Sequence, residues 1–299
     1  MKEYDQPTLQ RVQQLELMIL RDFMQFCDQN HLQYFGLAGT GIGAIRHQGF
    51  IPWDDDIDVG LPRKDYETFV KLATEQLSDK YIIMNPEYDS NFPLMTTRMM
   101  LKGTKFREES LKDIDCELGI FLDIYAYDQL ADDPKEYKKQ CRDAFILGKL
   151  LILRSVPFPV LPFKGWKAKL VHVVTAITHG AMVLFRISKP WLAKKCKAVA
   201  MRYDDAPTTQ KIGYLYETFP DTDQYLQKDL FPLKKYPFED VELPFGNNLP
   251  ANLTSLFGDF MQLPPPEKRK NHFPYELDFG PYADVPVEEL ANMGHFPRK

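Results

Sequence analysis

Residues 49–63, GFIPWDDDIDVGLPR, hold four aspartates within five positions, beside a tryptophan and several aliphatic residues. Acidic runs that face solvent rarely have such apolar neighbours. On an extended strand, residues two apart share a face, so one face carries carboxylates and the other is apolar. The carboxylates of the acidic face belong to Asp54, Asp56 and Asp58. Because the apolar face must lie against a core, the acidic face must lie against something positive.

A divalent cation is the partner that best explains this acidic face. Neighbouring carboxylates repel each other, and burying them without a partner is unfavourable. Mg²⁺ or Mn²⁺ prefers carboxylate oxygens and usually keeps a phosphate as a further ligand. The alternative is an acidic strand at the surface, paired with lysine or arginine. Asp55 falls on the apolar side of the pattern and is interpreted as a turn or capping residue.

A glycine-rich turn precedes the acidic strand. In AGTGIGAIRH, residues 38–47, Gly39 and Thr40 stand where a strand meets a helix, and backbone N–H groups at such a junction can hold phosphate oxygens. The spacing is not GxGxxG, so a dinucleotide-binding fold is not expected. Asp123, in the apolar stretch FLDIY, supplies a further carboxylate on a later strand. A Gly-Thr turn, an acidic strand and a later carboxylate in this order predict a nucleotidyltransferase-like fold.

A longer stretch around the aspartates, GLAGTGIGAIRHQGFIPWDDDIDVGLPRKDYETF, can be compared as a whole. It resembles the LicD family of phosphodiester-forming transferases, with the fukutin-related protein as a more distant relative. The resemblance continues through TTRMMLKGTKFRE at 96–108, GIFLDIYAYD, and a late block at 236–274. One departure is Gly41-Ile42, where the family usually has two leucine-like residues, and residues 142–235 carry little of the pattern.

The resemblance implies transfer of a phospho-alcohol from a CDP-alcohol to a sugar hydroxyl, with release of CMP. CDP-choline is the favoured donor, and the implied acceptor is a glycan or lipid-linked glycan, such as a teichoic acid precursor. The implied catalytic residues are Asp56, Asp58 and Asp123, with Mg²⁺ or Mn²⁺ as cofactor. Asp123 or Asp54 could hold a second metal or accept the proton of the acceptor hydroxyl. The expected metal ligands are therefore Asp54, Asp56, Asp58 and Asp123.

Four cationic side chains are expected to meet the donor phosphates together with the Gly-Thr turn. Arg46 and His47 lie between that turn and the aspartates, and Arg98 lies in a family-like segment. Arg63 follows the acidic strand, where it could instead pair with a nearby acid. His272 belongs to the late block and could either reach the site or remain at the surface.

Alternating strands and helices in the first 130 residues must position these groups. Thr8 is expected to cap a helix whose apolar residues recur every three or four positions over 9–26,. Helical period returns over 63–77, and strands are predicted at 81–84 and 119–128,. The fold class predicted from this pattern is α/β (α+β), with a mixed sheet flanked by helices.

Three parts are expected along the chain. They are a nucleotidyltransferase-like catalytic core over 1–133, a basic helical insertion over 134–215, and an irregular segment over 216–299 that packs on the core and completes the site. Residues 142–200 hold eleven Lys or Arg and one acid, a charge of +10 in a chain whose total is −5.

The basic insertion contains a helix, predicted over 170–186, that is apolar except for one narrow polar stripe. Tryptophans and lysines stand at its two ends, which is typical of a helix that contacts an anionic membrane surface. The alternative is a buried helical lobe whose basic residues face solvent or the acidic core. The polar stripe consists of His172, Thr175, His179 and Arg186.

Composition narrows the compartment and the partners. The four cysteines form neither a CxxC pair nor a zinc spacing, which favours reduced thiols,. The first residues, MKEYDQPT, contain no apolar signal-peptide region,. The net charge of −5 argues against nucleic acid as a partner,. A cytoplasmic protein with peripheral contact at the inner face of the membrane is therefore expected.

Three alternative functions are kept in view. The same chemistry could use another CDP-alcohol, carrying ethanolamine, glycerol or ribitol. A metal-dependent glycosyltransferase also uses an Asp-x-Asp site, but its nucleotide-binding half would need more than the 55 residues that precede Asp56. A non-catalytic scaffold is a poor explanation, because it has no need for concentrated carboxylates.

Overall fold

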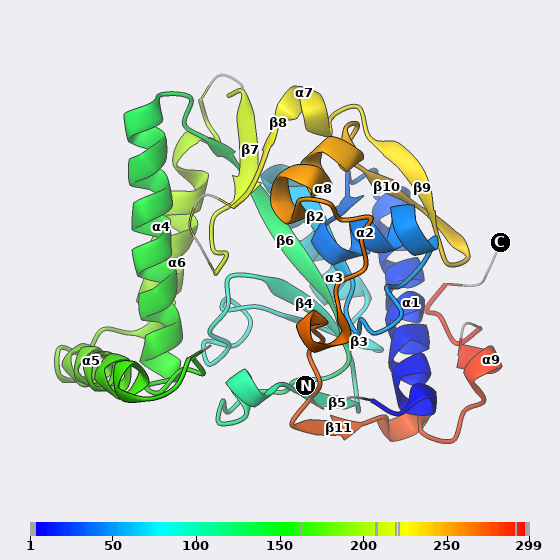
Figure 1. Ribbon diagram of the computed structural model, residues 1–299, viewed down its shortest axis with the longest axis horizontal. Coiled ribbons are helices and arrows are strands. Elements are labelled where there is room, and N and C mark those ends of the chain that lie inside the picture. The colour runs from blue at the N-terminus through cyan, green and yellow to red at the C-terminus, as the bar shows by residue number, and fades with distance from the viewer. Residues whose placement is uncertain are drawn as a thin grey trace.

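The centre of the molecule is a mixed sheet built around one long strand, β6 (Figure 1). The computed structural model describes residues 4–296 except 162, 207, 208, 219, 221 and 291. In this part of the chain, seven strands form the sheet in the order β1-β2-β6-β4-β3, and β7 joins β6 to β8. β2 and β6 run parallel, and the other neighbours run antiparallel. The strands are β1 Phe35–Gly36, β2 Asp58–Pro62, β3 Tyr81–Met84, β4 Thr97–Leu101, β6 Phe121–Leu130, β7 Lys211–Tyr214 and β8 Asp223–Leu226. The predicted α/β class is confirmed.

Helices α1 (Gln6–Gln29) and α3 (Arg63–Gln76) pack together against the sheet. Their apolar residues are buried at the predicted helical spacing, and the rings of Phe23 and Phe69 meet edge to face at 5.1 Å. α1 begins earlier than predicted, because Asp5 rather than Thr8 is its N-cap. The Asp5 carboxylate accepts the Thr8 N–H at 2.9 Å, and a proline in the first turn favours this start,.

The acidic segment is only partly a strand. β2 begins at Asp58, whereas the prediction placed a strand over all the aspartates. Asp54 N–H donates to the carbonyl of Ile51, which makes a turn there, and a strand ladder starts only where Asp58 meets β6. α2 (Ala38–His47) lies beside this point, and the Thr40 hydroxyl accepts the Asp58 N–H at 2.9 Å.

Three helices in the basic part of the chain form a lobe beside the sheet (Figure 1, left). They are α4 Pro134–Ser155, α5 Trp166–Leu184 and α6 Lys189–Ala200. α4 and α6 pack against each other, and α5 lies at the foot of α4. Lys197 fixes the lobe to the core through ion pairs with Glu67 at 2.9 Å and Glu87 at 2.8 Å.

The last part of the chain is more regular than predicted. β9 pairs with β10, β11 pairs with β5, and α8 packs on α2. Local pattern did not reveal these short elements, because each depends on a partner elsewhere in the fold. The remaining strands are β5 Lys105–Arg107, β9 Lys234–Phe238, β10 Val241–Phe245 and β11 Glu276–Asp278. The remaining helices are α7 Gln227–Leu230, α8 Leu249–Phe257, α9 Val287–Leu290 and the 3₁₀ turns Glu109–Leu111, Met201–Tyr203, Pro266–Lys268 and Gly280–Tyr282.

Candidate active site

Strand register aligns three charged residues across the middle of the sheet. Asp58 of β2 is opposite Asp123 of β6, and Arg98 of β4 is opposite Asp123 on its other side. Paired residues on neighbouring strands project from the same face, and all three side chains line one cavity. The pairing of three strands therefore gathers residues that lie far apart in the sequence.

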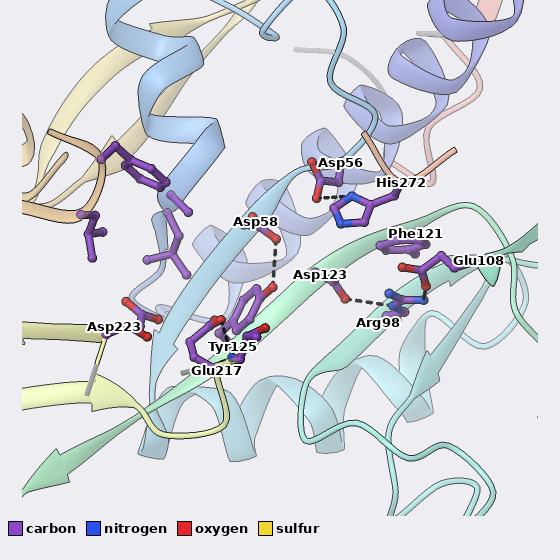
Figure 2. A pocket seen from close by; sticks show the side chains of 16 residues that line it. Asp56, Asp58, Arg98, Glu108, Phe121, Asp123, Tyr125, Glu217, Asp223 and His272 are labelled. Atoms are coloured by element: carbon purple, nitrogen blue, oxygen red, sulfur yellow. Dashed lines mark hydrogen bonds and ion pairs between the residues drawn. The ribbon is translucent and has the colours of Figure 1, made fainter. Parts of the chain in front are cut away.

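The cavity has a volume of about 360 Å³ and an excess of negative charge (Figure 2). The acidic segment adds Asp56 to its lining, and the C-terminal segment adds His272. Ala38 at the start of α2 and Phe257 at the end of α8 form part of another wall. Among the described residues that line it, six are acidic, whereas Arg98 and His272 are its basic side chains.

Asp56 and His272 form an ion pair inside this cavity. His272 Nδ1 lies 3.0 Å from Asp56 Oδ2. Burial alone would raise the pKa of Asp56, but the hydrogen bond and charge of His272 outweigh burial and hold that pKa below its ordinary value. The same hydrogen bond and charge raise the pKa of His272. Of the two roles open to His272 in the sequence, the structure thus favours a place in the site.

Asp58 has no basic partner comparable to His272 among the described residues. The Tyr125 hydroxyl donates to its Oδ1 at 3.2 Å. Burial raises the pKa of Asp58 well above its ordinary value, and the charges of Asp56 and Asp123 raise it further. A positive ligand placed between these carboxylates would remove that repulsion.

Asp123 is held in place by a buried arginine. Arg98 donates through Nε to Asp123 at 3.0 Å and through Nη1 to Glu108 at 2.7 Å, and its guanidinium stacks 3.8 Å from the ring centroid of Phe121. Burial raises the pKa of Asp123 to about 6, although Arg98 opposes this shift. The expected phosphate-binding residue Arg98 therefore lies in the cavity, but two of its N–H groups are already bound to carboxylates.

The start of α2 lies directly beside the acidic segment. The Asp54 carboxylate approaches Gly39 so closely that a Cβ there would stand 3.2 Å from Asp54 Oδ2. Ala38 has φ of +40°, a conformation that costs a non-glycine residue about 1–3 kcal/mol,. Strain of this kind gathers at functional sites, and the first turn of a helix leaves N–H groups directed toward an anion.

Asp55 turns away from the cavity and anchors two distant segments. It is fully buried, and its carboxylate accepts hydrogen bonds from the Tyr4 hydroxyl at 2.6 Å and from the His272 N–H at 2.7 Å. The interpretation as a turn or capping residue does not describe this bonding, because both partners lie far from Asp55 in the sequence and neither is the end of a helix next to it. Asp55 positions His272 next to Asp56.

Of the expected donor-binding residues, Arg98 alone is among the described residues that line the cavity, and the expected metal ligand Asp54 does not line it either. The residues outside the lining are Gly39, Thr40, Arg46, His47 and Arg63. Arg46 donates to the His47 ring at 2.9 Å and to the carbonyl of Phe260 at 2.5 Å. Arg63 makes a bidentate pair with the buried Asp128, at 2.6 and 2.8 Å. These contacts place Arg46, His47 and Arg63 in structural roles in this conformation, and contact with a donor stays a prediction.

Sequence reasoning missed a carboxylate beneath the site. Glu16 of α1 is fully buried, and neither of its oxygens has a hydrogen-bond partner in the described part of the chain. Burial raises its pKa well above the ordinary value, and the charges of Asp55 and Asp56 add to that shift. The sequence did hold a signal, because a glutamate stands between Leu15 and Leu17 in an otherwise buried helix. Glu108 and Tyr125 were also missed.

The residues present fit a hard divalent cation. Asp56, Asp58 and Asp123 offer carboxylate oxygens around one cavity, and the burial and mutual repulsion of Asp58 and Asp123 favour a cation there,. Among the described residues, the group with metal-binding geometry is Asp55, Asp56 and His272, whose ligand atoms lie within 4.8 Å of one another. In that group the Asp55 oxygens already accept two hydrogen bonds, from the Tyr4 hydroxyl and the His272 N–H.

A mixed sheet with clustered carboxylates beside a glycine-rich helix start is typical of enzymes with a nucleotidyltransferase fold. Comparison with known proteins agrees, since the family described as "LicD/FKTN/FKRP, nucleotidyltransferase domain" matches residues 31–111. The lipopolysaccharide cholinephosphotransferase LicD of Haemophilus influenzae is 30% identical over 272 residues, covering 89% of this chain and 96% of that protein. An uncharacterized protein of Rickettsia typhi is 40% identical over 57 residues, covering 19% of this chain and 18% of that protein.

The chain belongs to the LicD family, and it is a phosphotransferase. The matched region 31–111 contains the glycine-rich turn, the acidic segment and Arg98, whereas Asp123 and His272 lie beyond it. The fold brings these later residues into the same cavity.

Proposed function

We propose that the protein transfers phosphocholine from CDP-choline to a hydroxyl group of a cell-surface glycan precursor and releases CMP. The observation that carries this proposal is the cavity in which Asp56, Asp58 and Asp123 converge. Likeness to a lipopolysaccharide cholinephosphotransferase over 89% of the chain supports choline as the alcohol. A lipopolysaccharide or teichoic acid precursor is the acceptor class.

Asp56 and Asp58 would hold Mg²⁺ or Mn²⁺, with Asp54 and Asp123 as further ligands. The ion would neutralise the diphosphate of the donor and the charge that develops on CMP. The first turn of α2, with Gly39 and Thr40, would bind phosphate oxygens through backbone N–H groups.

The chain's own groups can also move the proton of the reaction. The acceptor oxygen forms a bond to the phosphorus that carries choline, while the bond from that phosphorus to CMP breaks. If Asp54 rather than Asp123 completes the metal site, Asp123, with a pKa raised by burial to about 6, is in a range suited to accepting the hydroxyl proton near neutral pH,. Arg98 keeps the Asp123 carboxylate in a fixed orientation.

The acceptor would be presented at the inner face of the cell membrane. A glycan precursor linked to lipid stays at that surface, so a cytoplasmic enzyme must make peripheral contact with an anionic leaflet to reach it. The basic, partly apolar helical lobe supports this location.

Donor choice gives the direct experiment. Purified protein with Mg²⁺ is incubated with CDP-choline, CDP-ethanolamine, CDP-glycerol, CDP-ribitol and UDP-sugars, and CMP or UDP release is measured with and without a hexosamine-containing acceptor. We expect acceptor-dependent CMP release, largest with CDP-choline, and its loss with EDTA.

The controls decide between chemistries. Asp58→Asn should be inactive, whereas Asp113→Asn, at an exposed position outside the cavity, should match the wild type. UDP release from a sugar nucleotide without CMP release from any CDP-alcohol would replace this proposal with a glycosyltransferase. A larger rate with CDP-ribitol, CDP-glycerol or CDP-ethanolamine would keep the chemistry and change the alcohol.

A further inference from the structure

Helix α5 directs polar side chains toward the protein and aliphatic side chains outward, the reverse of an ordinary surface helix. Three of the four residues of its polar stripe face the protein: Thr175 is buried, His172 Nε2 lies 3.1 Å from the carbonyl of Pro159, and His179 Nδ1 lies 2.8 Å from the carbonyl of Leu153. The fourth, Arg186, lies beyond the end of the helix and is exposed. The aliphatic side chains of the helix face outward instead. Leu170, Val173, Val174 and Ile177 are 56%, 55%, 55% and 66% exposed.

The exposed apolar surface extends beyond both ends of the helix. Trp166 is 71% exposed at its start, and Leu184 and Phe185 are 76% and 75% exposed at its end. Exposed Phe158 and Val160 precede it in the chain. Scattered apolar residues are normal on a protein surface, but a continuous patch indicates a binding partner. We call this surface, with Trp191 of α6, the α5 surface.

Positive charge surrounds the α5 surface. No acidic residue occurs between Asp143 and Asp204. Lys167 and Lys195 lie over the rings of Trp166 and Trp191, at 5.9 and 5.6 Å from the ring centroids. Within the described residues, none of the exposed basic side chains around this surface is paired with a carboxylate, in contrast to Lys197, which faces the core. These exposed side chains are Lys164, Lys167, Lys169, Arg186, Lys194 and Lys195.

The lobe does not have the form of a membrane span. In the described ranges, no single helix is both long and apolar enough to cross a bilayer. α5 meets that test only jointly with the segment Lys189–Tyr203, and the pair is bent by 106°. An outward apolar face with basic and tryptophan borders fits a helix that lies along a bilayer surface.

We propose that the α5 surface docks on an anionic lipid bilayer, with its aliphatic residues in the acyl boundary and its lysines at the headgroups. A second copy of this chain is a poorer partner, because a twofold contact would place one basic border against another. Anionic lipid matches both the apolar area and the charge around it.

Docking at this surface would connect the membrane with the catalytic cavity. α4 runs from α5 toward the sheet and lines a second cavity of about 190 Å³ with Phe145, Gly148 and Lys149. That cavity shares Tyr125 and Glu217 with the catalytic one. This purpose rests on the proposed function, but bilayer binding can be measured without any enzymatic reaction.

The test is sedimentation of the full-length protein with vesicles. Vesicles made of equal parts phosphatidylcholine and phosphatidylglycerol should bind the wild type at low salt and release part of it at about 1 M salt, where charges are screened within about 3 Å. Pure phosphatidylcholine vesicles should bind it weakly. Brominated acyl chains should quench tryptophan fluorescence, because Trp166 and Trp191 would lie at the lipid boundary.

Two pairs of variants separate charge from apolar contact. Lys164→Gln/Lys167→Gln/Lys169→Gln should weaken binding on the order of 100-fold, from about 1 kcal/mol per lysine. The matched control Lys228→Gln/Lys234→Gln/Lys235→Gln removes equal charge at exposed positions outside the lobe and should bind as the wild type does. Val174→Gln/Ile177→Gln should abolish quenching, unlike Met261→Gln/Leu263→Gln, which changes exposed apolar residues outside the lobe.

Three results would overturn the docking proposal. They are wild-type protein that fails to bind anionic vesicles, equal losses in the test and control variants, or a dimer in sedimentation equilibrium that Val174→Gln/Ile177→Gln dissociates. Transfer to a soluble acceptor should persist in all these variants. Wild-type protein that binds anionic vesicles but transfers nothing to a soluble acceptor would count against the proposed function and would not affect the docking proposal.

Discussion

The candidate active-site cavity and the α5 surface depart from ordinary protein architecture in opposite ways. The first buries carboxyl groups: burial and neighbouring charges raise the pKa values of Asp58 and Asp123 in the cavity and of Glu16 beneath it. The second exposes apolar area, because α5 turns its aliphatic side chains outward and its histidines inward. Neither arrangement helps an isolated chain to fold.

From this contrast we infer that both regions bind partners that are not part of the chain. A buried cluster of like charges is stabilised by a cation, and an exposed apolar face with a basic border is stabilised by an anionic bilayer. The buried cluster should therefore gain stability when metal is added, whereas the α5 surface should respond to lipid and not to metal.

The largest effect is expected from Asp58→Asn, which removes one carboxylate from the row that β2, β6 and β4 form. CMP release should fall on the order of 10³-fold or more, because charge on the donor phosphates and the leaving group loses its support. Melting without metal should be unchanged or higher, since repulsion with Asp56 and Asp123 is relieved,. Near-normal turnover would remove Asp58 from the site.

Next is Arg98→Met, which leaves Asp123 and Glu108 buried without their arginine. Breaking such a buried pair costs about 3–5 kcal/mol of unfolding free energy, measured by urea denaturation in EDTA. The control Arg21→Met breaks the more exposed pair with Asp240, 47% exposed, and should cost about 0–1 kcal/mol,. Equal losses in the two variants would show that the row is not a special site of buried charge.

The pH dependence of metal binding should distinguish the cavity from the rest of the molecule. The folded pKa of Asp123, about 6, lies above its ordinary value of 3.8. Its contribution to metal-free stability is therefore full below about pH 4 and is lost as the pH rises through about 6,. Metal competes with that proton, so the rise in Tm on adding Mn²⁺ should grow between pH 5 and pH 7. An increment that does not change with pH would contradict this coupling.

The smallest effect is expected from Glu16→Gln, which keeps the shape of the side chain and removes its charge. Without metal, Tm should rise by a few degrees, because a buried carboxyl group near Asp55 and Asp56 no longer has to be kept neutral,. The rise in Tm on adding Mn²⁺ should be smaller than in the wild type, as differential scanning fluorimetry can show. A lower metal-free Tm would mean that the carboxyl group has a structural partner.

The clustered carboxylates and the later Asp123 could be predicted from sequence, because chemical type and apolar neighbours are local properties. The strand face predicted for them was wrong in part, since β2 begins only at Asp58 and Asp54 does not line the cavity. Asp58 and Asp123 do meet in one cavity. The contributions of Arg98 and His272 depend on long-range pairing: Arg98 reaches Asp123 through strand register, and His272 is placed by a hydrogen bond to Asp55. No local pattern contains either partner.

In the helical lobe, too, local sequence predicted the elements but not their long-range contacts. The composition of residues 142–200 predicted basic helices, and the structure has them. Which face of α5 contacts the protein could not be predicted from its sequence. The pattern shows which residues share a face, but not whether the polar or the apolar face packs against the lobe. Contacts with Pro159 and Leu153 fix that direction.

Calorimetric titration of CDP-choline into the protein, in Mg²⁺ and again in EDTA, measures whether a cation held by the carboxylates is needed to bind the donor. We expect clear binding in Mg²⁺, at least about tenfold weaker binding in EDTA, and the same weakening for Asp58→Asn in Mg²⁺. Equal affinity with and without metal, or wild-type affinity in Asp58→Asn, would contradict the claim that the carboxylate row holds a cation for the donor.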